Sequence, residues 1–114
     1  MSAVARLVVL RNDGGREEDY SLLNDGTPIS IGRTAKCELR IRDNCVSRTH
    51  AQILVRDTAV IIVNKSTTQP NPMTVNGCEV TDERELFGGD LIEFRLEDHV
   101  KLIRMDYEGD SGLV

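Results

Sequence analysis

The sequence contains no tryptophan, few other aromatic residues, three prolines and only three cysteines. Without large aromatic side chains, the core of this 114-residue chain must be aliphatic, and its many Val, Ile and Leu residues favour β-strands. The sequence has no long amphipathic helical pattern, no internal repeat and no apolar run of about 18 residues. These absences argue against a helical bundle, a repeat array and a transmembrane helix. The length fits one domain with a single core.

The three cysteines, Cys37, Cys45 and Cys78, form an odd set without a Cys-x-x-Cys pair. Disulfide-linked secreted domains use even sets of cysteines, and zinc sites usually bring their ligands in close pairs. The N-terminus also lacks the apolar segment of a signal peptide. We therefore expect no metal and no cofactor, and a protein of the cytosol or nucleus that is not secreted.

The net charge of the chain is −5 at pH 7, so direct binding of nucleic acid is not expected. The charge is unevenly distributed, however. Between Arg33 and Arg48, five basic residues stand against two acidic ones, a local net charge of +3. A locally basic segment on an acidic chain suits a small anionic group better than a long polyanion.

Short apolar or alternating segments, separated by turn residues, continue almost to the end of the chain. The segments expected to form strands are 3–11, 18–23, 28–31, 37–42, 51–56, 59–63, 73–75, 91–94 and 100–105. Asn76-Gly77 is the strongest hairpin signal between them. About ten short strands at this spacing predict a β-sandwich. We expect one domain over residues 1–107, and a disordered tail or the start of a linker over residues 108–114.

Three loops would lie at one end of such a sandwich. They are the loop after Gly32-Arg33, the loop containing Ser47, and Lys65–Pro72. A guanidinium fork, a hydroxyl and loop N–H groups are the donors that a tetrahedral dianion such as phosphate requires. Gly-Arg and Ser-x-x-His occur often by chance, so only their arrangement in the whole chain points to a phosphate site.

Five short motifs follow one another in a characteristic order: Gly32-Arg33, Ser47-Arg48-Thr49-His50, Asn71, Val75-Asn76-Gly77 and Gly89-Asp90. In this order and spacing the chain resembles the forkhead-associated (FHA) domain, over roughly residues 4–106. The resemblance implies an all-β, FHA-type sandwich of about 11 strands, with the binding loops at one end. It also implies that these loops bind phosphothreonine in partner proteins.

The resemblance assigns roles to individual residues. It implies that Arg33 pairs with the phosphate, that Ser47 donates its hydroxyl to it, and that Arg48 contacts the phosphate or the peptide backbone. Asn71 matches the family's asparagine that hydrogen-bonds the peptide main chain. The residues expected to be structural are Gly32, His50, Asn76 and Gly77, with the His50 ring tying the Ser47 loop to the Gly32 region.

The loop before Asn71 departs from the family pattern. The family has a threonine on the phosphate at the position of Pro70, and proline offers neither a hydroxyl nor an N–H. Three alternatives remain open: Thr67 or Thr68 contacts the phosphate, Lys65 supplies a charge, or the contact is missing. Thr68 also begins a Thr-Gln step of the kind that DNA-damage kinases phosphorylate. A phosphate there could occupy the pocket of the same domain, giving an autoinhibited monomer, or that of a second copy, giving a phospho-dependent homodimer.

The Asn-Pro-x-x-Val-Asn-Gly ending of this loop resembles FHA domains at the N-termini of chromosomal and DNA-damage mediator proteins, which implies a nuclear scaffold. We therefore expect a phosphothreonine-binding module, without a membrane partner, rather than an enzyme. The alternative is an interaction or homodimerisation module whose phosphate pocket is idle. Cys45 and His50 are an imaginable catalytic pair, but no third residue is indicated that would orient them.

Overall fold

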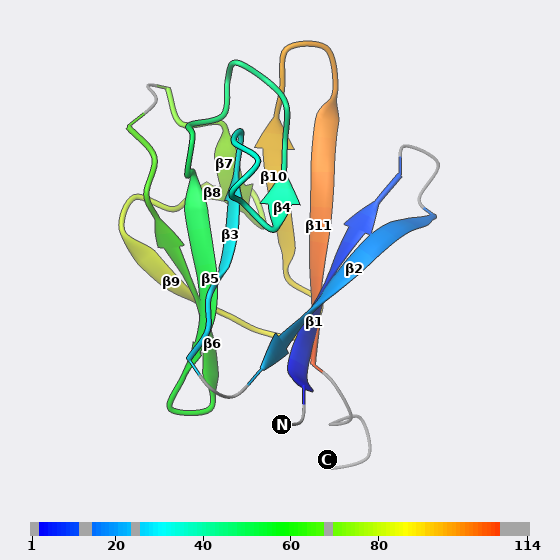
Figure 1. Cartoon of the computed structure of the whole chain (residues 1–114), viewed down its shortest axis with the longest axis vertical. Coiled ribbons are helices and arrows are strands. Elements are labelled where there is room, and N and C mark those ends of the chain that lie inside the picture. Colours follow the sequence, from blue (N-terminus) through cyan, green and yellow to red (C-terminus); the bar gives the residue numbers. More distant parts are fainter. Residues whose placement is uncertain (1–2, 12–14, 24–25, 68–69, 108–114) are drawn as a thin grey trace.

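The computed structural model describes residues 3–11, 15–23, 26–67 and 70–107. In this part of the chain eleven strands form two sheets that pack face to face (Figure 1). No helix occurs among these residues, and accordingly none is long and apolar enough to cross a membrane. The predicted all-β sandwich of about 11 strands is therefore confirmed.

The two sheets have six and five strands. The six-stranded sheet has the order β2-β1-β11-β10-β7-β8 and consists of β1 (Ala3–Leu10), β2 (Arg16–Leu23), β7 (Met73–Val75), β8 (Cys78–Glu79), β10 (Leu91–Arg95) and β11 (Val100–Tyr107). The five-stranded sheet has the order β4-β3-β5-β6-β9 and consists of β3 (Ile29–Gly32), β4 (Leu39–Arg40), β5 (Ala51–Arg56), β6 (Ala59–Asn64) and β9 (Glu83–Leu86). The short β3–β4 pair is parallel, whereas the other neighbouring strands of the described residues pair antiparallel.

The core lies between the inner faces of the sheets and is mainly aliphatic. Its largest fully buried side chains include Leu7, Ile53, Ile62, Phe94 and Ile103. Burial alternates along β5, where Ala51, Ile53 and Val55 point inward, as expected for a strand with one covered face. Because the core is continuous across both sheets, it supports the loops at both ends of the sandwich.

Strand β4 is shorter than the sequence indicated. A strand was expected over residues 37–42, but only Leu39 and Arg40 pair with β3. The alternation itself persists, because Leu39 and Ile41 are buried while Arg40 and Arg42 are exposed. Periodicity reports which side chains are covered, not whether a neighbouring strand is present to form hydrogen bonds.

Strands β8 and β9 were not expected from the sequence. Both residues of β8 are exposed, and β9 buries only Leu86. Each lies at the edge of its sheet, where a strand has one neighbour and little apolar surface to cover. An apolar pattern could not reveal strands that carry almost no buried side chains.

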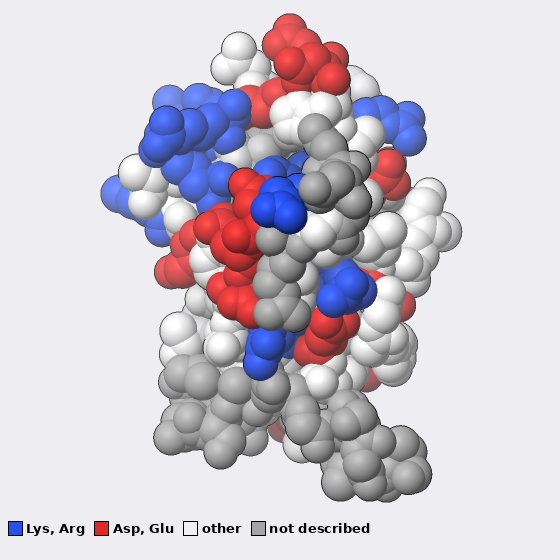
Figure 2. Space-filling view, turned by 90° about the vertical axis from the view of Figure 1, so that its right-hand side faces the viewer, with Lys and Arg blue, Asp and Glu red and all other residues white. Residues whose placement is uncertain are grey.

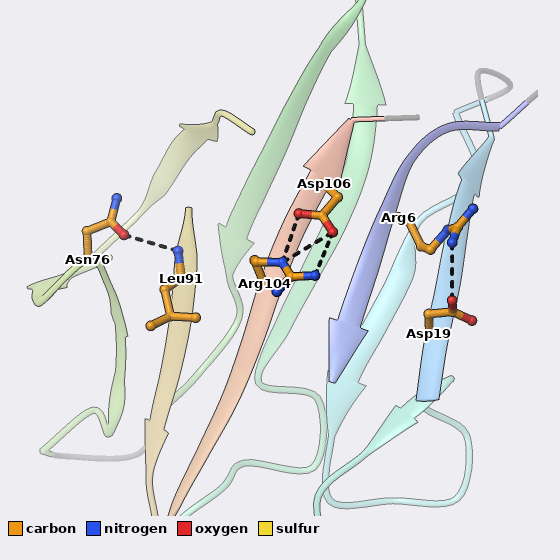
Figure 3. A network of polar contacts seen from close by, with 6 residues as sticks. All are labelled: Arg6, Asp19, Asn76, Leu91, Arg104 and Asp106. Carbon is orange, nitrogen blue, oxygen red and sulfur yellow. Dashed lines mark hydrogen bonds and ion pairs between the residues drawn. The ribbon is translucent and has the colours of Figure 1, made fainter. Parts of the chain in front are cut away.

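The Asn76-Gly77 turn joins β7 to β8 with both residues in the left-handed region, at φ 52° and 87°. The Asn76 side chain also reaches β10, where its Oδ1 accepts from Leu91 N–H at 3.0 Å (Figure 3). Its Nδ2 donates to Asp90 Oδ1, also at 3.0 Å. Asp90 Oδ2 in turn accepts the N–H of Phe87 at 2.8 Å. The Val-Asn-Gly and Gly-Asp motifs therefore form one structural unit that anchors β7 to β10.

The loops β3–β4, β4–β5 and β6–β7 lie at the upper end of the sandwich in Figure 1. The beginning of β1 and the end of β11 lie at the opposite end. Between them, the outer face of the six-stranded sheet carries ion pairs such as Arg6–Asp19 at 3.4 Å and Arg104–Asp106 at 3.0 Å (Figure 3). The three predicted binding loops therefore share one end, away from the described chain ends.

Candidate functional site

An open pocket of about 550 Å³ lies at the end of the sandwich where the three loops meet. Its described lining combines cationic, hydroxyl-bearing and other residues, namely Arg33, Arg48, Lys65, Ser47, Thr49, Thr67, Asn44 and Val46. Three cations and three hydroxyls thus surround this pocket, and none of its described lining residues is acidic. The composition of the pocket suits a group that carries several anionic oxygens.

Gly32 is required by close packing between two loops. Its backbone lies directly against the carbonyl of Arg48, and a Cβ at this position would overlap that oxygen. It would also lie 2.8 Å from Sγ of Cys37, which donates to the same carbonyl at 3.3 Å. Only glycine lets the end of β3 and the serine-containing loop approach this closely, so the structure gives the expected structural role of Gly32 a specific cause.

Arg33 is held against the loop of residues 41–50, which we call the Ser47 loop. Its N–H donates to the carbonyls of Ser47 and Arg48, both at 3.1 Å, and its Nε donates to the carbonyl of Val46 at 3.0 Å. Its two terminal nitrogens have no partner among the residues that the structure describes. The guanidinium is therefore oriented by one nitrogen while two remain available to an anion.

The Ser47 loop is organised by its own hydrogen bonds. Asp43 Oδ1 accepts the N–H of Cys45 at 2.8 Å, and the Asp43 carbonyl accepts the N–H of Val46 at 3.0 Å. The bond from the Cys45 backbone lowers the pKa of the Asp43 carboxyl, so this acid stays ionised and keeps its place in the turn. The N–H of Ser47 is turned inward to Nδ1 of His50 at 3.0 Å.

His50 is fully buried, and both ring nitrogens are used. Because Nδ1 accepts the Ser47 N–H, the proton of the neutral ring lies on Nε2, which donates to Oδ1 of Asn71 at 2.7 Å. The ring also packs edge-on against Phe94, with centroids 5.2 Å apart. Burial lowers the pKa of His50 and keeps the ring neutral, an effect that the Asn71 hydrogen bond partly opposes.

The partners of His50 differ in part from the expectation. Its ring ties the Ser47 loop to Asn71, whereas the link toward the Gly32 region is made by the His50 backbone N–H, which donates to the carbonyl of Ile31 at 2.7 Å. The family resemblance located the histidine, but it did not identify what the ring would contact, because the contacting residue lies 21 positions further along the chain.

Asn71 belongs to the same internal network. Its Oδ1 accepts from the His50 ring and from the N–H of Met73 at 3.0 Å. Its Nδ2 donates to Oδ1 of Asn64 and to the carbonyl of Val80, both at 3.4 Å. The two long bonds are the weaker ones, so the amide nitrogen could exchange one of them for a peptide carbonyl. Contact of Asn71 with a peptide main chain stays a prediction.

The segment of residues 65–72, which we call the Lys65 loop, begins beside the Ser47 loop. The N–H of Lys65 donates to the carbonyl of His50 at 2.8 Å, and the Lys65 and Thr67 side chains line the pocket. Thr68, the third candidate in this loop, lies outside the described residues. Lys65 and Thr67 therefore remain placed to supply the contact that Pro70 cannot.

Ser66 was missed in the interpretation of the sequence. Its Oγ lies 3.1 Å from Oγ of Ser47, and its N–H donates to Oδ1 of Asn64 at 3.1 Å. The Asn64-x-Ser66 step at the end of β6 is a local turn signal that could have drawn attention to it. The structure thus adds a second hydroxyl beside Ser47, on the loop that departs from the family pattern.

Basic side chains gather at this end of the molecule, and acidic ones form separate groups at the tip and lower on the same face (Figure 2). The side chains of Arg48 and Lys65 in the pocket have no hydrogen-bond or ion-pair partner in the described part of the chain. With the available nitrogens of Arg33, they provide uncompensated positive charge around the pocket, although the whole chain is acidic. Such a field attracts a dianion at short range.

The arrangement does not support a Cys45–His50 catalytic pair. A hydrogen bond with Asp43 raises the pKa of the Cys45 thiol, which disfavours the reactive thiolate. His50 uses one nitrogen for a backbone N–H and the other for Asn71, so its ring has no free acceptor for a thiol proton. Among the described residues, no group of three or more His, Cys, Asp or Glu side chains is placed to hold a metal ion.

Comparison with known proteins gives a consistent result. The family model described as "FHA domain" matches residues 29–95, which is more than half of the chain. The chain is also 33% identical over 103 residues to the proliferation marker protein Ki-67 of Mus musculus. That match covers 86% of this chain but only 3% of the relative, so the chain corresponds to one small part of a much longer protein.

Solved structures show the same fold. A structure from a study of phosphothreonine-dependent FHA domain interactions is 26% identical, with a TM-score of 0.70, and the match covers 92% of this chain and 97% of the other. The FhaA FHA domain, complexed with an intracellular domain, is 27% identical with a TM-score of 0.67 and coverage of 89% and 98%. The MEK1 FHA domain is 18% identical with a TM-score of 0.77 and coverage of 93% and 91%, which shows the fold alone.

Proposed function

Because the chain belongs to the FHA domain family, an interaction-module family, we propose that its pocket binds phosphothreonine in a partner protein. The observation that carries this proposal is the pocket of about 550 Å³, which Arg33, Arg48 and Lys65 line together with Ser47, with no acidic residue in the described lining. The study in which one similar structure was solved concerns phosphothreonine-dependent interactions of FHA domains.

In this proposal the phosphate is held by donors of two kinds. The terminal nitrogens of Arg33 form a charge-assisted fork, and Arg48 and Lys65 add charge at the rim. The hydroxyls of Ser47 and Ser66 share a hydrogen bond, and one of them turns to the phosphate when it binds. The main chain of the peptide then lies across Asn71, whose amide nitrogen exchanges one long bond for a peptide carbonyl.

We expect phosphothreonine to bind more tightly than phosphoserine. The threonine methyl adds apolar surface, and burying one such group contributes roughly 1 kcal/mol, or several-fold in affinity. Matched peptides that differ only in this methyl measure the effect by isothermal titration calorimetry. Equal affinities would exclude an apolar niche for the methyl.

The decisive experiment compares a phosphothreonine peptide with its unphosphorylated twin, using peptides from an oriented phosphopeptide library. The natural domain should bind only the phosphorylated member. Arg33→Ala should reduce this binding by about 2–5 kcal/mol, enough to abolish a micromolar interaction, while the domain stays folded. Arg56→Ala is the matched control, because Arg56 forms an exposed ion pair with Glu83 and lies outside the described pocket lining.

The alternative is an interaction or homodimerisation module with an idle pocket. It predicts that both members of the peptide pair behave alike and that Arg33→Ala has no effect on any partner. The open, cationic lining of the pocket favours a pocket that binds phosphate over this alternative. If Arg33→Ala still bound phosphopeptide within twofold of the natural domain, the assignment of Arg33 would be wrong.

We also propose that the domain works in the nucleus, in a chromosome-associated or DNA-damage scaffold. This rests on the Asn71-Pro72-x-x-Val75-Asn76-Gly77 ending of the Lys65 loop, which resembles that of mediator proteins of this kind. Affinity capture from separated nuclear and cytoplasmic extracts tests it, with Arg33→Ala as the bait control. Phospho-dependent partners found only in the cytoplasmic extract would overturn the nuclear assignment.

A further inference from the structure

A second basic pocket adjoins the phosphate pocket. It is open, has a volume of about 320 Å³ and is lined by Arg33, Arg40, Arg42, Asp43, Asn44 and Glu97. Two of these residues, Arg33 and Asn44, also line the first pocket. The two hollows are therefore neighbours along one surface rather than separate sites.

The two additional arginines come from β4 and from the residues that follow it. Arg40 Nε donates to the carbonyl of Arg33 at 2.9 Å, which fixes this side chain beside the residue that orients the phosphate. The other nitrogens of Arg40, and the whole guanidinium of Arg42, have no partner within the described ranges. Both side chains are exposed, so ligand can reach them directly.

The acids of the second pocket differ in how they are held. Asp43 is occupied by the turn of the Ser47 loop, where its oxygens accept the N–H groups of Cys45 at 2.8 Å and Glu97 at 3.4 Å. The side chain of Glu97 is exposed and has no partner among the described residues. Three guanidinium groups therefore face two carboxylates in this pocket, a net charge of +1, and only the Glu97 carboxylate has no hydrogen bond within the described residues.

We infer that this second pocket takes a second anionic side chain of the same bound segment, so that the preferred ligand carries a phosphothreonine with another phosphate or carboxylate nearby. The inference rests on the proposed function, because the phosphothreonine places the segment. A phosphate ester is favoured over a carboxylate since it carries more charge and more acceptor oxygens, which two arginine forks can use together.

The test starts from a singly phosphorylated peptide that binds and adds a second phosphate, or an aspartate, at each neighbouring position in turn. At one position the second phosphate should raise affinity about two- to fivefold, the upper part of the range expected for exposed charged contacts. Aspartate at the same position should give a smaller gain. If the two gains are equal, the pocket accepts any anionic side chain, and the preference for phosphate is wrong.

Two substitutions with opposite expected effects on the affinity gain from the second phosphate make the test specific. Arg42→Gln should remove the gain from the second phosphate and leave binding of the singly phosphorylated peptide unchanged. Glu97→Gln should enlarge the gain, because the free carboxylate that opposes the second anion is removed. Arg56→Gln, which changes a distant exposed arginine, should alter neither value.

The outcomes separate the two proposals. If the singly phosphorylated peptides do not bind the natural domain, the proposed function fails and the second pocket fails with it. If they bind but no position gains more than twofold from a second anion, only the second pocket is overturned. A gain that survives Arg42→Gln in full would likewise place the second anion elsewhere.

Discussion

The Ser47 loop and the Lys65 loop contribute to the same pocket, yet they are held in different ways. In the Ser47 loop the backbone is tied inward, through Asp43, the ring of His50 and the end of β3. The Lys65 loop is attached at its beginning by the Lys65 N–H and near its end by Asn71, and between them it presents the exposed side chain of Thr67. Substitution of a side chain that holds the loop backbones, such as His50, should therefore affect folding as well as binding. Substitution of a side chain that only reaches the pocket, such as Ser47 or Thr67, should affect mainly binding.

The largest effect is expected for His50→Ala. The substitution removes a fully buried ring and leaves the Ser47 N–H and Asn71 without their partner, so we expect a loss of about 3–5 kcal/mol in the free energy of unfolding. Urea denaturation measures it. His99→Ala, at an exposed position, is the control and should change stability by less than about 0.5 kcal/mol. A His50→Ala variant as stable as the natural domain would contradict the role of the ring as a tie between the loops.

The next effect is expected for Ser47→Ala, and it should fall mainly on binding. A hydrogen bond to a charged phosphate is lost, which costs roughly 1–3 kcal/mol in phosphopeptide affinity. The backbone bonds of residue 47 to His50 and Arg33 do not involve the hydroxyl, so stability should change little. Calorimetric titration and urea denaturation on the same preparation separate the two quantities, with Ser21→Ala, at an exposed position of β2, as the control. An affinity equal to that of the natural domain would exclude a Ser47 contact.

Smaller effects are expected in the Lys65 loop. Ser66→Ala or Thr67→Ala should weaken phosphopeptide binding by about 0.5–1.5 kcal/mol if its hydroxyl replaces the one missing at Pro70, with no loss of stability. Thr81→Ala, an exposed threonine outside the described pocket lining, is the matched control. If both substitutions leave affinity unchanged, neither residue supplies the contact, and Lys65→Ala and Thr68→Ala then test the other two candidates. If these also leave affinity unchanged, the contact is missing.

The smallest expected effect is the pH dependence of stability that comes from His50. Burial lowers the pKa of His50 in the folded protein below its ordinary value of 6.5, so the unfolded chain binds the proton more readily. The stabilising contribution is therefore complete above about pH 6.5 and declines as the pH falls from there toward the folded-state pKa, with a slope of at most about 1.4 kcal/mol per pH unit. Urea denaturation across this range measures the slope. The slope should persist in the His99→Gln variant, which keeps His50. If the natural domain showed no slope, the buried His50 ring would accept a second proton without loss of stability.

Much of the fold follows from local signals. Asn76-Gly77 forms the tight turn after β7 that the sequence predicted, and the left-handed residues Asp57 and Thr58 join β5 to β6. The family and the sandwich were also correctly inferred, because five weak motifs in one order and spacing are far more informative than any one of them. The edge strands β8 and β9 escaped prediction, since pairing through the backbone leaves no apolar pattern in the side chains.

The site was predictable to a similar extent. Arg33 and Ser47 could be placed at one pocket because each follows or precedes a strand at the same end of the sheet. The hydroxyl of Ser66 beside Ser47 could not, because the two residues are 19 positions apart and their contact depends on how two loops meet. The double use of Asn71, which faces His50 inside the domain and is expected to meet the peptide outside, was equally hidden.

The sequence by itself determined the strands with a covered face, the sharp turns, and the chemical types of the groups around the pocket, because these depend on neighbouring residues and on local backbone preferences. Only the tertiary structure decided which atoms the His50 ring joins, which nitrogens of Arg33 remain available, and that Arg40 and Arg42 lie in a pocket beside the first one. Those features are long-range hydrogen bonds and the meeting of loops. Their geometry is set by the packing of two sheets on a common core rather than by any short stretch of the chain.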